Sequence, residues 1–116
     1  MTETRETTDP LTAVEKNAFT LSQAAVRLDQ ARHQPRHLAE ALTDNAELWI
    51  AIQSAVRRAN GALSPAVRSN LLKLGDFIVA TTIRADGEVT DHTLDTLINI
   101  NLQISEGLLE GQARNS

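Results

Sequence analysis

Two asparagines occupy positions where a helical repeat would normally place apolar side chains. Asn45 lies within the apolar run of residues 38–59 and Asn101 within that of residues 94–108. The apolar residues of both runs recur at steps of three and four, which places them on one side of a helix. A buried amide that lacks a hydrogen-bond partner costs about 1–3 kcal/mol. We therefore expect each asparagine to mark a specific packing arrangement.

Three interpretations of these amides are open. They bond each other across the core and fix the register of the helices, as a core asparagine does in coiled coils. Alternatively, they satisfy backbone groups of neighbouring segments, or they line a groove that a partner fills. We favour the two structural interpretations and assign Asn45, Trp49 and Asn101 to a structural seam. Trp49 follows Asn45 by one turn, and we expect it to anchor the core with its indole N–H bonded.

The other residues whose side chains could act in catalysis or bind a metal form no catalytic or metal-binding pattern. His33 and His37 are four residues apart, the spacing of half a metal site on a helix. However, Pro35 lies between them and no third ligand is evident, so we expect two solvated histidines. Ser64 precedes a proline and is better explained as a helix cap than as a nucleophile. The sequence predicts no enzyme, no metal and no cofactor.

Composition narrows the possible partners. The 116-residue chain has a net charge of −4, 3% aromatic residues and no cysteine. The acidic balance and the scarcity of aromatic rings argue against direct nucleic-acid binding. No signal peptide and no membrane-spanning run is apparent, so we expect a soluble, cytoplasmic protein without membrane contact. An RNA contact through Arg57, Arg58 and Arg68 is an alternative, and it would be salt-dependent and mostly nonspecific.

The periodicity predicts an all-α fold, a compact antiparallel bundle of four main helices. Prolines mark three of the helix starts, and Asn60-Gly61 and Asp86-Gly87 supply stop signals. The short connections favour antiparallel neighbours. The expected helices span about residues 10–32, 35–59, 65–85 and 91–110. We expect a flexible tail at residues 1–8, a single domain at 9–111 and a second tail at 112–116.

A second apolar stripe makes the helix of residues 65–85 the best place to look for a partner surface. Its central face runs Val67, Leu71, Leu74, Ile78 and Thr82, and the second stripe lies roughly 120° around the helix. Gly75 lies between the two stripes, where its missing side chain would admit a close neighbour. The bundle either buries both stripes or leaves a groove for an amphipathic helix. The candidate partner-binding residues are Leu72, Val79 and Ile83 of this helix, together with Ile98 and Leu102 of the last one.

Three segments of the chain resemble the bacterial flagellar regulator family FlaF. They are ALTDNAELW at residues 41–49, LSPAVRSNLLKLGDFI at residues 63–78, and LININLQISEGL at residues 97–108. The last segment is the most distinctive, and the resemblance covers about residues 38–109. The first predicted helix agrees in length and amphipathicity.

The resemblance implies a small helical protein that is needed for flagellin production and filament assembly. Such a protein acts as a chaperone that binds flagellin before its export, and it works with or against the flagellin-translation repressor FlbT. Because the ends of flagellin are helical and amphipathic, a helix-in-groove contact is the natural mode. Two alternatives remain: an RNA-associated regulator of the flagellin message, and an adaptor that binds FlbT only. The sequence leaves the oligomeric state open.

Overall fold

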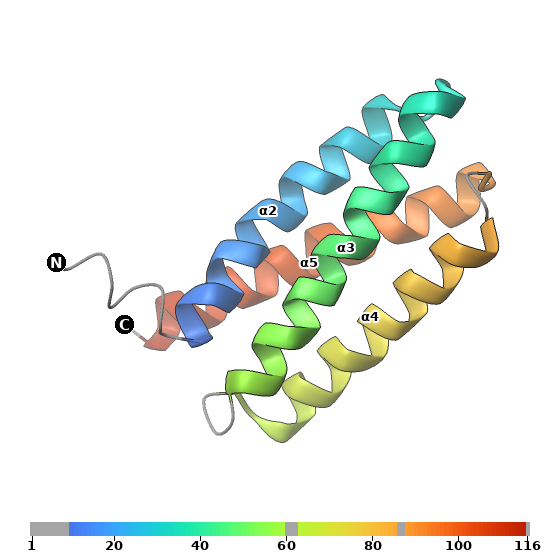
Figure 1. The fold of residues 1–116 in the computed structure, drawn as a ribbon. Coiled ribbons are helices and arrows are strands. Elements are labelled where there is room, and N and C mark those ends of the chain that lie inside the picture. Colours follow the sequence, from blue (N-terminus) through green and yellow to red (C-terminus); the bar gives the residue numbers. More distant parts are fainter. Residues whose placement is uncertain (1–9, 60–62, 86–87, 116) are drawn as a thin grey trace, which may run out of the picture.

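The computed structural model describes residues 10–59, 63–85 and 88–115, with side chains for residues 16, 18–59, 63–85 and 88–108. These parts of the chain form helices and no strand. Consecutive helices run in opposite directions, which confirms the predicted all-α antiparallel bundle (Figure 1). The helices are α2 (Pro10–Gln30), α3 (Pro35–Ala59), α4 (Pro65–Ala85) and α5 (Asp91–Asn115).

The helix starts follow from local chemistry. Ser64 caps α4, because its hydroxyl oxygen accepts a hydrogen bond from the Val67 backbone N–H at 3.2 Å. Thr90 caps α5 in the same way, accepting from the Thr93 N–H at 3.1 Å. The expected stop signals at Asn60-Gly61 and Asp86-Gly87, and the expected tail at residues 1–8, lie outside the described residues.

Two helix ends differ from the prediction. Helix α2 ends at Gln30 and not at residue 32, because tighter bonds such as Arg32 N–H to Asp29 O take over before Pro35. Helix α5 continues to Asn115, five residues beyond its expected end at 110. A glycine inside a helix costs only about 1 kcal/mol relative to alanine. Gly111 is followed by good helix formers, so it does not end α5.

Helices α2 and α3 are the inner two in the packing order α5–α2–α3–α4. Helix α2 contacts both α3 and α5, and α3 contacts α4 on its other side. In Figure 1, α5 runs behind α3, and α4 lies beside α3. The shortest dimension of the molecule is 22 Å, about two helix diameters, so the helices form two layers. The core between them includes Trp49, Ile52 and Leu97, each fully buried.

Helix α4 buries only part of the expected seam, of which Leu71 and Ile78 are buried as predicted. Its buried residues are Leu71, Gly75 and Ile78. The expected seam included Val67 and Leu74, but Val67 is 41% exposed and Leu74 is half-buried. The helix is rotated so that Gly75 faces α3, because a glycine at this position allows close approach of the neighbouring helix.

Candidate partner-binding site

A buried hydrogen-bond network joins three helices at the seam. The Trp49 indole N–H donates to Asn101 Oδ1 at 2.9 Å. The Asn101 amide nitrogen donates to Asn45 Oδ1 at 2.6 Å and to the Leu21 carbonyl oxygen at 3.3 Å. Trp49, Asn45 and Asn101 are all 0% exposed. The asparagines therefore bond each other, as in the first of the three interpretations, and Asn101 also bonds a backbone group, as in the second.

The network is incomplete at Asn45. Its Nδ2 atom is buried and has no hydrogen-bond partner among the described residues. Asn101, by contrast, uses its amide oxygen once and its amide nitrogen twice. Because both side chains are enclosed, neither is available to a partner at the surface. Their role is to fix how α2, α3 and α5 pack.

A second polar contact fixes α3 against α4. Gln53 of α3 is buried, and its Nε2 donates to the Leu72 carbonyl oxygen and to Asp76 Oδ1, each at 2.9 Å. A Cβ added at Gly75 would lie 2.5 Å from Gln53 Nε2. The close neighbour expected at Gly75 is therefore Gln53, a residue that sequence reasoning had not singled out. A glutamine on α3 carries no periodic signal that distinguishes it from solvent-facing polar residues.

One arginine links the end of α2 to the start of α5. Arg32 Nη2 lies 2.6 Å from Asp95 Oδ1 and 3.0 Å from Asp29 Oδ1, and Nη1 lies 3.3 Å from Asp91 Oδ1. The hydrogen bonds that the Arg32 guanidinium donates to Asp95 and Asp29 raise its pKa above its usual range. Arg32 therefore stays charged wherever the protein is folded, and added salt weakens its ion pairs with the exposed aspartates.

An apolar hollow lies on the surface between α3 and α4. Its volume is about 440 Å³, and exposed Ile50 and Ile83 stand at its edge, 51% and 72% accessible. Half-buried Val79 contributes a further apolar wall. Small side chains fill much of the remaining lining, which lets another backbone come close. That lining consists of Ala39, Leu42, Thr43, Ala46, Glu47 and Thr82.

The structure brings together some of the candidate partner-binding residues and separates others. Val79 and Ile83 line the hollow, whereas Leu72, Ile98 and Leu102 do not. Helices α4 and α5 are not among the strongly packed pairs of the described residues, and Ile98 and Leu102 lie apart from the hollow that Val79 and Ile83 line. The sequence could not show this, because helix periodicity does not say which helices become neighbours. Ile50 was missed, since it lies beside the asparagine-containing stripe of α3.

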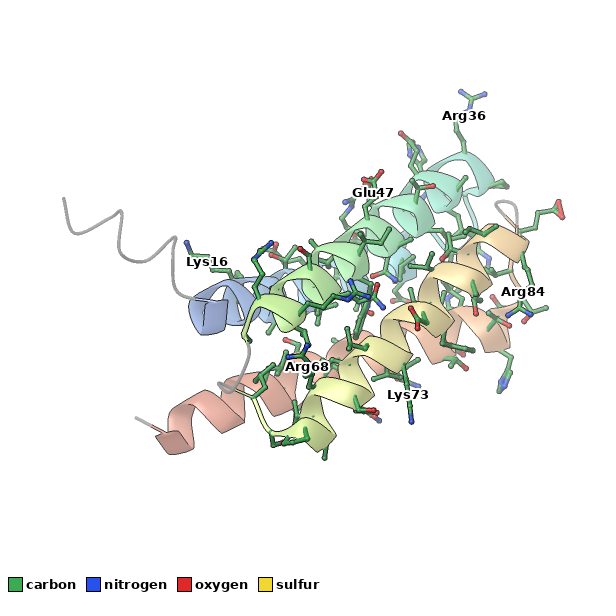
Figure 2. The ribbon with its side chains drawn as sticks, turned by 60° about the horizontal axis from the view of Figure 1, so that its bottom comes forward. Lys16, Arg36, Glu47, Arg68, Lys73 and Arg84 are labelled. Carbon is green, nitrogen blue, oxygen red and sulfur yellow. The ribbon has the colours of Figure 1, made fainter. Side chains whose placement is uncertain are left out.

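The charged and histidine side chains lie mostly on the surface. His33 and His37 are exposed, and no group of three potential ligands forms a metal site in the described parts of the chain. Arg57 and Arg58 lie in the last turn of α3 and are exposed. Figure 2 shows Arg68 in the first turns of α4, and Lys73 and Arg84 directed outward from the same helix. No described helix is long and apolar enough to cross a membrane.

Together the described residues form a small four-helix bundle with polar contacts between its helices and an apolar hollow between α3 and α4. The family model described as flagellar protein FlaF matches residues 2–108. The chain therefore belongs to the FlaF family of flagellar proteins. Comparison with curated proteins and with solved structures gave no match.

Proposed function

We propose that this protein is a cytoplasmic chaperone that binds flagellin before its export and thereby promotes flagellin production and filament assembly. The observation that carries the proposal is the apolar hollow between α3 and α4 in a member of a flagellar family. Interplay with the repressor FlbT belongs to the same proposal and is supported by the resemblance described above. In this account the protein acts by binding and not by catalysis.

The shape and lining of the hollow favour an amphipathic helix as the ligand. Ile50 and Ile83 stand on opposite helices, so an apolar side chain inserted between them would contact both. Ala46 and Thr43 leave room for the backbone of a docked helix. Helix-in-groove complexes use apolar anchors spaced along one face of the bound helix, and the amphipathic ends of flagellin have such faces. Docking there would cover an assembly segment until export.

Substitutions at the edge of the hollow test the proposal. Ile83→Glu and Ile50→Glu place a carboxylate where an apolar anchor would be buried, which is unfavourable without a partner charge. We expect each variant to bind monomeric flagellin at least about tenfold more weakly in isothermal titration calorimetry. Because both side chains are largely exposed, the thermal melts should change little.

Phe77→Glu is the matched control. Phe77 lies on α4 and is 43% exposed, but it does not line the hollow. It should bind flagellin as the unmodified protein does. The proposal is wrong if Ile83→Glu retains full affinity, or if Phe77→Glu weakens binding equally.

A salt series separates this proposal from the RNA alternative. Apolar docking should persist at about 1 M salt, where electrostatic contacts are screened within about 3 Å. Binding of the flagellin message through Arg57, Arg58 and Arg68 would instead fall steeply with salt and vanish on nuclease treatment. Recovery of the message without flagellin protein would favour the RNA alternative.

A further inference from the structure

Exposed apolar side chains also lie along α2 and α5, away from the hollow between α3 and α4. On α2, Phe19 and Val26 are seven residues apart and are 59% and 52% exposed. On α5, Leu102 is 40% exposed and Ile98 is half-buried. Residues seven apart lie on the same side of a helix, so each helix contributes one line of apolar side chains.

The contacts between α2 and α5 place these two lines side by side. Asp29 shares the Phe19 and Val26 side of α2, and Asp95 shares the Ile98 and Leu102 side of α5. Arg32 bonds both carboxylates, so these two sides border each other.

The register brings the apolar residues level with one another. The bond from Asn101 to the Leu21 carbonyl sets position 101 beside position 21. Because α2 and α5 run in opposite directions, Leu102 is level with Thr20, which lies between Phe19 and Val26 along α2. The Ser22 hydroxyl donates to the Phe19 carbonyl oxygen at 2.9 Å, so the gap contains no unpaired donor. The four side chains form one continuous stripe, which we call the α2–α5 stripe.

Acidic groups border this stripe. Asp29, Asp91 and Asp95 lie at one end, and exposed Glu106 lies one turn beyond Leu102. Arg32 is already engaged by the three aspartates. Arg27, next to Val26, is paired with Asp44 of α3. Lys16 lies one turn before Phe19, and Figure 2 shows it directed away from the bundle.

The acidic groups beside the α2–α5 stripe favour some binding partners over others. A second copy of the chain, itself of charge −4, would bring like charges together across the stripe. Nucleic acid and anionic membrane surfaces would be repelled for the same reason. A protein helix with lysine or arginine beside its apolar face would gain both apolar burial and charge complementarity.

We propose that the α2–α5 stripe docks a basic amphipathic helix of a partner protein. The surface is formed by other helices than the hollow between α3 and α4. The inference stands independently of flagellin binding, because no residue of the stripe lines the hollow.

The probe is a synthetic amphipathic helix of about 18 residues, long enough to form a helix on binding. It has a leucine stripe flanked by lysines, and a matched peptide has the same stripe flanked by glutamates. Binding to the full chain is followed by fluorescence polarisation. We expect the lysine peptide to bind at least about tenfold more tightly than the glutamate peptide.

Substitutions then locate the contact. Val26→Lys and Leu102→Lys should each weaken binding of the lysine peptide by about tenfold or more, since they remove an apolar contact and add a like charge. Phe77→Lys, at an equally exposed position on α4, should not, and neither should Ile83→Glu. Circular dichroism confirms that each variant is folded.

Three results would overturn the inference. The first is equal binding, or no binding, of the two peptides. The second is loss of binding in Ile83→Glu but not in Val26→Lys, which would place the peptide in the hollow between α3 and α4. The third is a dimer of the unmodified chain in sedimentation that Val26→Lys converts to a monomer, which would make a second copy the occupant.

Discussion

At the scale of single residues, the side chain of Asn101 connects α5 to two other helices. Its oxygen accepts from Trp49, and its nitrogen donates to Asn45 and to the Leu21 backbone. Asn45 makes one of these bonds and leaves its own Nδ2 without a partner among the described residues. The two asparagines therefore contribute unequally to stability, although both are fully buried.

Replacing each asparagine with leucine measures this difference. Asn101→Leu leaves the Trp49 N–H and the Asn45 oxygen buried and unpaired, and each such group costs about 1–3 kcal/mol. Asn45→Leu removes one hydrogen bond and also removes an unpaired donor. We therefore expect a smaller decrease in the free energy of unfolding, within about 1 kcal/mol. Urea unfolding gives both values. Helix content should be retained in both variants, but Asn101→Leu should show loosened tertiary packing.

Equal decreases in the free energy of unfolding for Asn101→Leu and Asn45→Leu would contradict this account. A uniquely folded, more stable Asn101→Leu monomer would show that the asparagine does not fix helix register.

The seam residues were identifiable from the sequence, but Gln53 was not. An asparagine inside a run of leucines and isoleucines interrupts a clear pattern, so the spacing alone marks Asn45 and Asn101. Gln53 gains its role only when Gly75 of another helix lies opposite, and no local pattern specifies that pairing. Residues whose importance depends on a distant neighbour escape sequence reasoning for this reason.

At the scale of elements, polar contacts join the packed helices: the seam network joins α2, α3 and α5, Gln53 joins α3 to α4, and Arg32 joins the end of α2 to α5. Helix bounds were mostly predictable, because prolines and capping hydroxyls act within one turn of the chain. The choice of neighbours was not predictable: α5 packs mainly on α2, and α4 and α5 are not among the strongly packed pairs of the described residues. Val79 and Ile83 therefore line the hollow between α3 and α4 without the apolar residues of α5.

Gly75→Ala tests the joint between α3 and α4. The new Cβ would lie 2.5 Å from Gln53 Nε2, so Gln53 must move and lose its bonds to the Leu72 carbonyl and Asp76. We expect a loss of about 1–3 kcal/mol in the free energy of unfolding. In a Gln53→Ala background the same change should be neutral or stabilising, because alanine favours helix by about 1 kcal/mol over glycine. The same cost in both backgrounds would exclude Gln53 as the obstacle.

Arg32→Gln tests the joint between α2 and α5. The substitution removes the ion pairs with Asp29, Asp91 and Asp95 and leaves three carboxylates close together. We expect a lower melting temperature and faster amide exchange in the first turn of α5. The difference from the unmodified protein should shrink at about 1 M salt, which screens exposed charges. A difference that does not depend on salt would indicate lost packing of the arginine stem instead.

At the scale of the whole molecule, a rigid interior supports two separate apolar surfaces. The seam network and the Gln53 contact fix the helices, so the hollow between α3 and α4 and the α2–α5 stripe keep their shapes without a ligand. Under the two proposals above, this protein of a flagellar family would hold an export substrate in the hollow and a second protein on the α2–α5 stripe. We expect the acidic border of the α2–α5 stripe and the mainly apolar lining of the hollow to favour different helices.

The most direct test of the central claim is an NMR titration of isotope-labelled protein with monomeric flagellin. The account predicts that amide shifts concentrate on Thr43, Ala46 and Ile50 of α3 and on Val79 and Ile83 of α4, and that the pattern persists at about 1 M salt. Shifts confined to other faces, or no shifts at flagellin concentrations far above those in the titration calorimetry, would contradict it.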